Sequence, residues 1–397
     1  MAAKDVLVLV LSVLALVFAD QAFVGLSGNG SLVLTPPAGG QVLVDGVVFR
    51  SLLDRLQQLE TQVETQAQQL EGLQCTTVAD TTTITGLSGS NMWHLAVLAG
   101  NGKIYGIPYD STSVLIIDPA TNTADTTTIT GLSGNAKWAG GVLAGNGKIY
   151  GIPLNSASVL IIDPATNTAD TTTITGLSGN CCRWNSGVLA GNGKIFGIPL
   201  NSASVLIIDP TTNTADTTTI AGLDGDSKWR GGVLADNGKI YGIPHRSTSV
   251  LIIDPATNTA DTTTISGLPS GNSKWHSGVL AGNGKKIYGM PSSYASVLII
   301  DPATNTADIT TIMGLTGNYK WHGGVLAGNG KIYGIPFNSA SVLIIDPATN
   351  TADTTTITGL NGEWGGGVLA GNGKIYGIPW NSASVLIIKR DCEGLVL

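Results

Sequence analysis

From residue 75 onward, the chain repeats one pattern of short apolar runs separated by polar turns. In the copy at 137–174, the runs are residues 140–144, 148–152, 158–162 and 171–174. None of them has the 3.6-residue spacing of an amphipathic helix, and β-branched residues dominate the third run. Each copy therefore predicts four short antiparallel strands.

The residues between the runs are turn formers. Asn146-Gly147 separates the first two runs, and we expect a type I′ hairpin turn with positive φ at both positions. Pro153 ends the second run because it has no backbone N–H. Asp163-Pro164-Ala165-Thr166-Asn167 predicts a second turn, in which Pro fixes φ and Asp and Asn bond nearby backbone.

The copies follow one another at a nearly fixed period. An Ala-Asp pair ends at Asp80, Asp125, Asp170, Asp216, Asp261, Asp308 and Asp353, with successive differences of 45, 45, 46, 45, 47 and 45 residues. A period of this length is typical of a propeller, a solenoid or an array.

The ends of the repeat region distinguish a ring from an open stack. The region opens with a fourth strand at 80–84 and stops after a third strand at 384–388, so the two fragments complete one unit. A linear stack is expected to end in whole capping units. Seven units each begin with a tryptophan: Trp93, Trp138, Trp184, Trp229, Trp275, Trp321 and Trp364. We therefore predict an all-β, seven-bladed β-propeller of four-stranded antiparallel blades, closed by the N-terminal strand.

Two cysteines flank the predicted seam. Cys75 and Cys392 fall in the two halves of one broken Asp-Pro turn, so we expect a disulfide between them to latch the ring. In the chain-entropy model, closing so long a loop contributes on the order of 5 kcal/mol. Cys181-Cys182 is a separate insertion, either reduced or joined as a vicinal pair.

The first 74 residues have a different character. Residues 1–19 resemble a signal peptide, with Lys4 before an apolar run and small residues at the cleavage positions; a retained anchor is the alternative. Residues 20–49 form a small β-prone segment. The propeller then spans residues 75–392, and 393–397 form a tail. Export would supply the oxidising compartment that a disulfide needs.

Residues 50–74 have helical periodicity. The apolar stripe consists of Leu52, Leu56, Leu59, Val63, Leu70 and Leu73. The stripe covers about three heptads, which is short for a coiled coil. The segment therefore either forms a homo-oligomer, which we favour, or packs against the propeller as a stalk.

The repeat resembles known blade families. Gly141-Val142-Leu143, Asn146-Gly147-Lys148-Ile149-Tyr150 and the Asp-Pro-Ala-Thr-Asn-Thr turn look like a kelch-type blade, and are similar to the YVTN-type blades of exported bacterial propellers. Ile152-Pro153 stands where kelch blades carry a Gly-Gly doublet, and Ala169-Asp170 stands where they carry Trp. The resemblance implies architecture and not activity, because propellers host enzymes, binders and scaffolds.

The copies differ from one another mainly in two loops. The first-to-second and third-to-fourth turns scarcely change, whereas the second-to-third and inter-blade loops carry almost all of the variation. In a four-stranded meander these loops share one face, and loops on a rigid scaffold often carry binding residues. The candidate ligand-binding residues are His94, Tyr109, Arg230, His245, Arg246, His276, His322, Phe337 and Trp380. Neutral drift in exposed loops is the competing explanation.

Charge on this predicted face is uneven. Arg183, Lys228, Lys274 and Lys320 join the basic candidates in an arc beside aromatic residues. Such an arc suits an anionic or carbohydrate-like ligand. The leading tryptophans are interpreted instead as wedges between blades. Residues of the Lys148 type should pair across strands with those of the Asp163 type, except where Lys374 faces Lys389 and Asp391 or Glu393 must compensate.

No established catalytic arrangement is recognised. The chain has four histidines, without the close spacing of metal ligands, so no cofactor, metal or catalytic residue is assigned. Its formal net charge of −7 argues against a nucleic-acid partner. We expect an exported, secreted or cell-surface, non-catalytic binding or adhesion module for a glycan or an extracellular protein. A lyase or oxidase acting on a polysaccharide at the channel mouth and a purely structural surface protein are the alternatives.

Overall fold

The computed structural model describes residues 23–26, 32–35, 43–44, 47–48, 55, 57–59, 61–62, 75–177, 179, 181–282 and 285–392. The chain divides into two compact units: residues 1–75 with 392–397, and residues 76–391. In the first unit, β1 (Phe23–Leu26) pairs with β2 (Leu32–Thr35), and β3 (Leu43–Val44) pairs with β4 (Val47–Val48).

The predicted helix at 50–74 is described only in part. Residues 55, 57–59 and 61–62 are helical, and Leu59 is 51% exposed. The signal peptide at 1–19, the tail at 393–397 and the remainder of the helix lie outside the described residues. Among the described residues, no helix has the length and apolar character to cross a bilayer.

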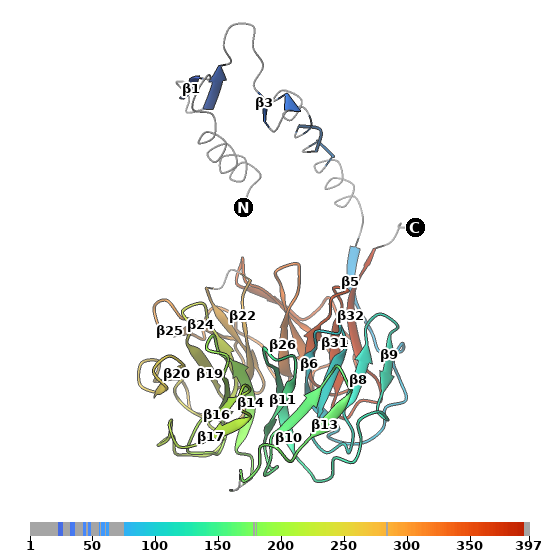
Figure 1. The fold of residues 1–397 in the computed structure, drawn as a ribbon, viewed down its shortest axis with the longest axis vertical. Helices are drawn as coiled ribbons and strands as arrows, with labels where there is room; N and C mark the ends of the chain where they lie inside the picture. Colours follow the sequence, from blue (N-terminus) through green and yellow to red (C-terminus); the bar gives the residue numbers. More distant parts are fainter. Residues whose placement is uncertain are drawn as a thin grey trace. The chain divides into compact units, whose positions relative to one another are not determined.

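Seven four-stranded antiparallel sheets make up the second unit and surround a common axis, with β5 and β32 side by side (Figure 1). The first strands are β6 (Trp93–Leu98), β10 (Trp138–Leu143), β14 (Trp184–Leu189), β18 (Trp229–Leu234), β22 (Trp275–Leu280), β26 (Trp321–Leu326) and β30 (Trp364–Leu369). The second strands are β7 (Ile104–Pro108), β11 (Ile149–Pro153), β15 (Ile195–Pro199), β19 (Ile240–Pro244), β23 (Ile287–Pro291), β27 (Ile332–Pro336) and β31 (Ile375–Pro379).

The outer half of each blade completes the meander. The third strands are β8 (Leu115–Asp118), β12 (Leu160–Asp163), β16 (Leu206–Asp209), β20 (Leu251–Asp254), β24 (Leu298–Asp301), β28 (Leu343–Asp346) and β32 (Leu386–Cys392). The fourth strands are β9 (Thr123–Asp125), β13 (Thr168–Asp170), β17 (Thr214–Asp216), β21 (Thr259–Asp261), β25 (Thr306–Asp308), β29 (Thr351–Asp353) and β5 (Cys75–Asp80).

The ring closes as predicted. The seventh sheet has the order β30-β31-β32-β5, so the N-terminal strand completes the C-terminal blade. First strands contact the first strands of neighbouring blades, including β30 with β6 across the seam, which places them innermost around the axis.

The predicted type I′ hairpin turn is wrong. Gly147 has a φ of 79°, but Asn146 does not have positive φ. Gly147 donates to the carbonyl of Ala144, and Ala144 donates to the carbonyl of Lys148. The loop is thus a three-residue connection in which one glycine takes the left-handed conformation. The Asn146 side chain accepts a hydrogen bond from the Lys148 amide at 3.0 Å, which holds the turn.

The fourth strand begins and ends earlier than the predicted run at 171–174. Residues 168–170 pair with β12, and Asp170 then accepts hydrogen bonds from the amides of Thr172 and Thr173 at 2.6 and 3.2 Å. Those amides are thereby turned away from the strand ladder. The hydroxyl of Thr173 also bonds the carboxylate, and these hydrogen bonds lower the pKa of Asp170 to about 2.

The apolar cores lie between blades, where the tryptophans act as the predicted wedges. One cluster packs Val142, Tyr150 and Ile161 of one blade against Trp184 and Ile195 of the next. The indole N–H of Trp184 donates to the carbonyl of Ser204 in its own blade at 2.7 Å. Each tryptophan therefore fills an inter-blade space with its polar atom satisfied.

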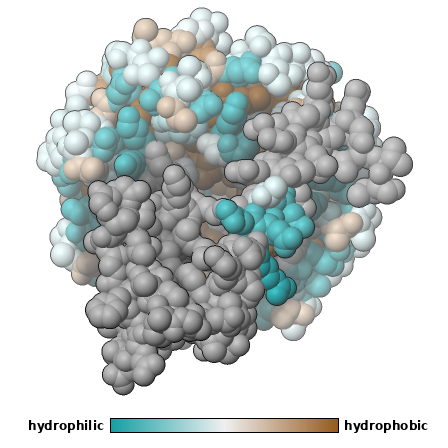
Figure 2. Space-filling view, turned by 90° about the horizontal axis from the view of Figure 1, so that it is seen from above, coloured by the Kyte–Doolittle hydropathy of each residue, from teal (hydrophilic) through white to brown (hydrophobic). Residues whose placement is uncertain are grey.

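The face with the two nearly constant turns, here called the constant face, is joined by hydrogen bonds between blades. The Tyr150 hydroxyl donates to Asn213 of the next blade at 2.8 Å, and Asn146 donates to Pro210 at 3.2 Å. Five blades repeat the tyrosine–asparagine bond. This face has hydrophilic side chains spread over its visible part (Figure 2). Its low variation therefore has a structural cause.

The seam and strand edges test two smaller predictions. Lys148 pairs with Asp163, and the equivalent pairs in four other blades lie at comparable distances, between 3.5 and 3.8 Å overall. Neither Lys374 nor Lys389 forms an ion pair among the described residues.

Cys75 is disulfide-bonded, whereas Cys181 and Cys182 are free thiols. Because the Cys392 side chain lies outside the described part, the pairing of Cys75 with Cys392 stays a prediction.

Candidate functional site

In each first strand, the residue after the leading tryptophan lies at a β-bulge, which points its side chain toward the axis. In β10, Trp138 pairs with Pro153 and Gly140 with Ile152, which leaves Ala139 as an extra residue. All seven first strands have a register shift at this point. A β-bulge bends its strand and redirects the side chain. The residues placed there are His94, Ala139, Asn185, Arg230, His276, His322 and Gly365.

Three of these positions bring histidines together across the axis. The rings of His94 and His276 lie 5.4 Å apart between centroids, and His276 stacks on His322 at 4.1 Å. His322 stacks in turn on Phe337 at 3.7 Å. Three of the four sequence-predicted histidines therefore converge, although they come from blades one, five and six.

The second-to-third loops add aromatic rings to the same group. Trp380 lies 5.3 Å from His94 and 4.6 Å from Tyr109, with edge-on geometry in both pairs. Phe337 lies 6.1 Å from Trp380. We call His94, Tyr109, His276, His322, Phe337 and Trp380 the axial cluster. The histidines are buried while the other three rings are partly exposed, so the cluster has a polar interior and an aromatic rim.

Burial keeps these imidazoles neutral near pH 7. Desolvation, reinforced by the positive charge of Arg230, lowers the pKa of His94 to about 4 and that of His245 to about 3. The same causes, together with neighbouring imidazoles, hold the pKa values of His276 and His322 well below their usual range. His94 Nδ1 donates to the carbonyl of Ala139. Both ring nitrogens of His276 and of His322 are buried without a hydrogen-bond partner.

Arg230 lies among these imidazoles without a counter-charge. Its side chain is partly exposed, but Nε is buried with no acceptor. No described residue forms an ion pair or a hydrogen bond with its guanidinium. A buried N–H donor without an acceptor is costly, so this position is unusual for a purely structural residue.

Other basic residues of the predicted arc have a structural role that sequence reasoning missed. Lys228, Lys274 and Lys320 are at most 5% exposed. The Lys320 amine donates to the carbonyls of Ser292, Tyr294 and Gly317 at 2.8, 3.0 and 2.9 Å. Arg183 likewise bonds backbone carbonyls. These cations tie neighbouring loops together and are not offered to a ligand.

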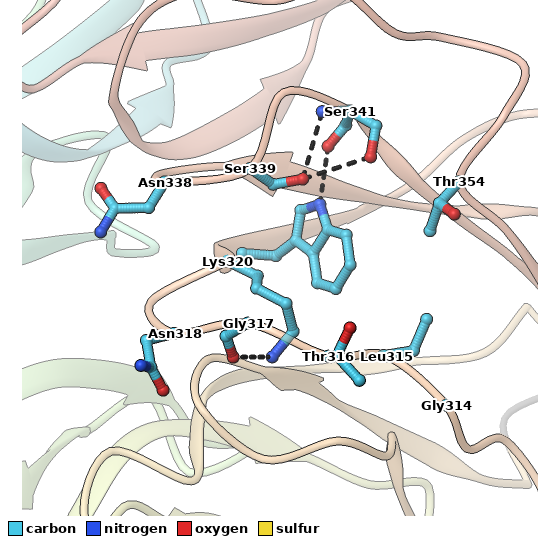
Figure 3. A pocket seen from close by; sticks show the side chains of 11 residues that line it. Gly314, Leu315, Thr316, Gly317, Asn318, Lys320, Asn338, Ser339, Ser341 and Thr354 are labelled. Carbon is cyan, nitrogen blue, oxygen red and sulfur yellow. Dashed lines mark hydrogen bonds between the residues drawn. The ribbon is translucent and has the colours of Figure 1, made fainter.

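Two cavities lie on the same face, each between an inter-blade loop and a second-to-third loop. The one in blade six has a volume of about 270 Å³ and is walled by Lys320, Trp321, Asn338 and Ser339 (Figure 3). The one in blade four has about 600 Å³ and includes Asp224, Asp226 and exposed Arg246. Arg246 is thus separate from the axial cluster and belongs to a charged groove.

The face that carries the axial cluster and these cavities, here called the variable face, also has a small apolar cluster. Ala139, Leu154 and Leu200 form a buried cluster that Tyr109 and Cys182 contact. Leu154 and Leu200 occupy the loop position of Tyr109, and their variation between blades is the signal by which they could have been found. Within the described residues, no group of three or more His, Cys, Asp or Glu is placed to hold a metal ion.

No family model matches the chain, and no curated protein matches it in sequence. Solved structures do match it. A streptogramin B lyase is 13% identical, with 79% of this chain and 98% of that one covered and a TM-score of 0.63. Virginiamycin B lyase from Staphylococcus aureus is 9% identical, with 80% and 99% covered and a TM-score of 0.64. The extracellular domain of BT4673 from B. thetaiotaomicron is 12% identical, with 76% and 41% covered and a TM-score of 0.58. At these identities the likeness is one of fold, and the chain is a seven-bladed β-propeller.

Proposed function

We propose that this protein is an exported, non-catalytic binding or adhesion module whose variable face engages a glycan or a protein. One observation carries the proposal: the side chains that differ most between blades meet at the axis on one face. Most of the constant-face residues instead hold turns or neighbouring blades together, as Tyr150 does with Asn213. Variation on one rigid face and constancy on the other is the expected pattern for a recognition surface.

The chemistry of the rim supports a glycan in particular. Tyr109, Phe337 and Trp380 are partly exposed and contact one another or the buried histidines. Aromatic rings offer flat apolar faces with polar edges, which suit the alternating apolar and hydroxyl-bearing faces of sugars. Arg230 and the groove around Arg246 add N–H donors for hydroxyl or acidic groups.

The remaining parts of the proposal concern export and assembly. A signal peptide at 1–19 would direct the chain to a secreted or cell-surface location, and the Cys75–Cys392 disulfide would latch the ring there. A homo-oligomer formed through residues 50–74 would present several variable faces and raise avidity. The blade pattern also favours kinship with kelch-like and YVTN-like repeats.

A glycan array probed with the full-length oligomer, followed by calorimetry on each hit, tests the proposal. Trp380→Ala and Tyr109→Ala should weaken binding at least tenfold, because each removes an aromatic contact. Lys148→Ala on the constant face is the control and should leave affinity unchanged. If no glycan or extracellular protein binds, a purely structural role becomes the better account; if the control weakens binding as much as Trp380→Ala, the face is misassigned.

A lyase or oxidase acting on a polysaccharide at the channel mouth is the second candidate. The unpartnered nitrogens of His276 and His322 favour it, since a neutral imidazole can accept a proton in general-base chemistry. Two of the structures similar in fold are lyases by name. Product formation from acidic polysaccharides, lost in His322→Gln and retained in Lys148→Gln, would favour this candidate over the binding module.

A further inference from the structure

We propose that Arg230 is the anchor of an oxyanion site at the axis, which takes a carboxylate or sulfate group. The inference rests on the proposed function and specifies the class of ligand that the variable face binds.

The first step is the missing counter-charge. Arg230 makes no ion pair or hydrogen bond with any described residue, and its Nε is buried. The side chain as a whole is partly exposed, but Nε has lost hydration without gaining an acceptor, and a buried donor left without a partner is destabilising. A bound oxyanion would supply the missing acceptors, because guanidinium and oxyanion match in a two-bond geometry.

The second step is the composition of the surroundings. The titratable groups that interact electrostatically with Arg230 come from seven loops and strands and include no Asp or Glu: they are His94, Tyr109, Cys182, His245, His276, Tyr319 and His322. Carboxylates are abundant elsewhere, with 27 Asp and Glu in the chain. The guanidinium of Arg230 therefore has no carboxylate partner among these groups and can pair with a bound anion.

The third step is the set of unused donors beside the arginine. A neutral imidazole carries one N–H, and those of His276 and His322 have no partner. These side chains are only 2% and 5% exposed. Two buried rings with four unsatisfied nitrogens would be costly in a closed core, and an anion in contact with them would satisfy part of that requirement.

A consequence is that anion binding should be linked to protonation. Burial and the charge of Arg230 together depress the pKa of His94 and His245. An anion at Arg230 would offset the second of these causes and raise the pKa values of the imidazoles. By linkage, the anion must then bind more tightly as protons become available.

Inorganic sulfate and acetate are the probes, with chloride at matched ionic strength as the reference. We expect sulfate to raise the melting temperature of the full-length protein in a saturable manner, more at pH 5.5 than at pH 7.5. Arg230→Gln should abolish the effect. The control Lys148→Gln, which removes one positive charge from the constant face, should retain it. Arg230→Lys should retain a weaker response, since it keeps the charge but not the paired donors.

The outcomes separate this inference from the proposed function. Sulfate and acetate effects no greater than chloride, or a sulfate effect unchanged in Arg230→Gln, would overturn the oxyanion site. A pH-independent sulfate affinity would overturn the role of the imidazoles. If neutral glycans bind equally to the wild type and Arg230→Gln while sulfate does nothing, the binding module stands without this site. If sulfate binds at Arg230 but no glycan or protein does, the site stands and the proposed function fails.

Discussion

Phe196 is a natural interruption of the hydrogen bonds that join the blades. In five of the other six blades, tyrosine at this position donates to an asparagine in the next blade, as Tyr150 does to Asn213 at 2.8 Å. Phe196 has no hydroxyl, and the corresponding Oδ1 of Asn258 is buried without a partner. Asn192 still donates to Pro255 at 3.0 Å, so the surrounding turn keeps its geometry. Phe196→Tyr would therefore place a hydroxyl where an acceptor is already positioned.

The expected gain follows from that geometry. A buried acceptor without a partner costs about 1–3 kcal/mol, and a new internal hydrogen bond contributes about 0.5–1.5 kcal/mol net. We therefore expect Phe196→Tyr to raise the free energy of unfolding by about 1 kcal/mol. In a domain of this size, that corresponds to roughly 2 °C in melting temperature. Tyr150→Phe should lower stability by a similar amount.

Denaturant unfolding and thermal melts at fixed scan rate measure the change. A double-mutant cycle with Asn258→Gly isolates the new bond, because glycine tolerates the φ of 53° at this position. A coupling energy of about 1 kcal/mol between the tyrosine hydroxyl and Asn258 is expected. The reasoning is refuted if Phe196→Tyr is neutral or destabilising while Tyr150→Phe costs 1 kcal/mol or more.

Three further predictions concern the ring. Gly365→Ala would put Cβ 2.2 Å from the His94 carbonyl oxygen and should cost roughly 1–3 kcal/mol in denaturant unfolding; Gly145→Ala, which has open space, should not. In thermal melts, stability should be full above pH 6.5 and should fall as the pH drops toward 4. Burial holds the pKa of His94 at about 4, so in this pH range the unfolded chain binds more protons than the folded one. A melting temperature that does not change with pH would contradict the buried neutral imidazoles. Non-reducing peptide mapping should recover Cys75 joined to Cys392, and Cys75→Ser should lower the melting temperature; a different pairing would remove the latch.

The sequence could predict which residues lie on the variable face, but not their burial or their hydrogen-bond partners. Comparison of the seven copies indicated which residues vary, and the meander placed those variable loops on one face. The bulge in each first strand was not apparent, since it arises from pairing with the second strand. Burial of Lys228, Lys274 and Lys320 was missed for a related reason: the carbonyls that satisfy them belong to loops folded against the lysine from the preceding blade.

The sequence by itself determined the strands of a blade, the number of blades and the closure of the ring. Turn residues and strand propensity act locally, and the repeated copies within the chain can be compared with one another directly. It misplaced the fourth strand, where a side-chain carboxylate competes with the ladder for backbone amides. Only the tertiary structure decided which variable residues meet. His94 and His276 are 182 positions apart in the chain, and their contact depends on the curvature of a closed ring, which sets how blades one and five face each other across the axis.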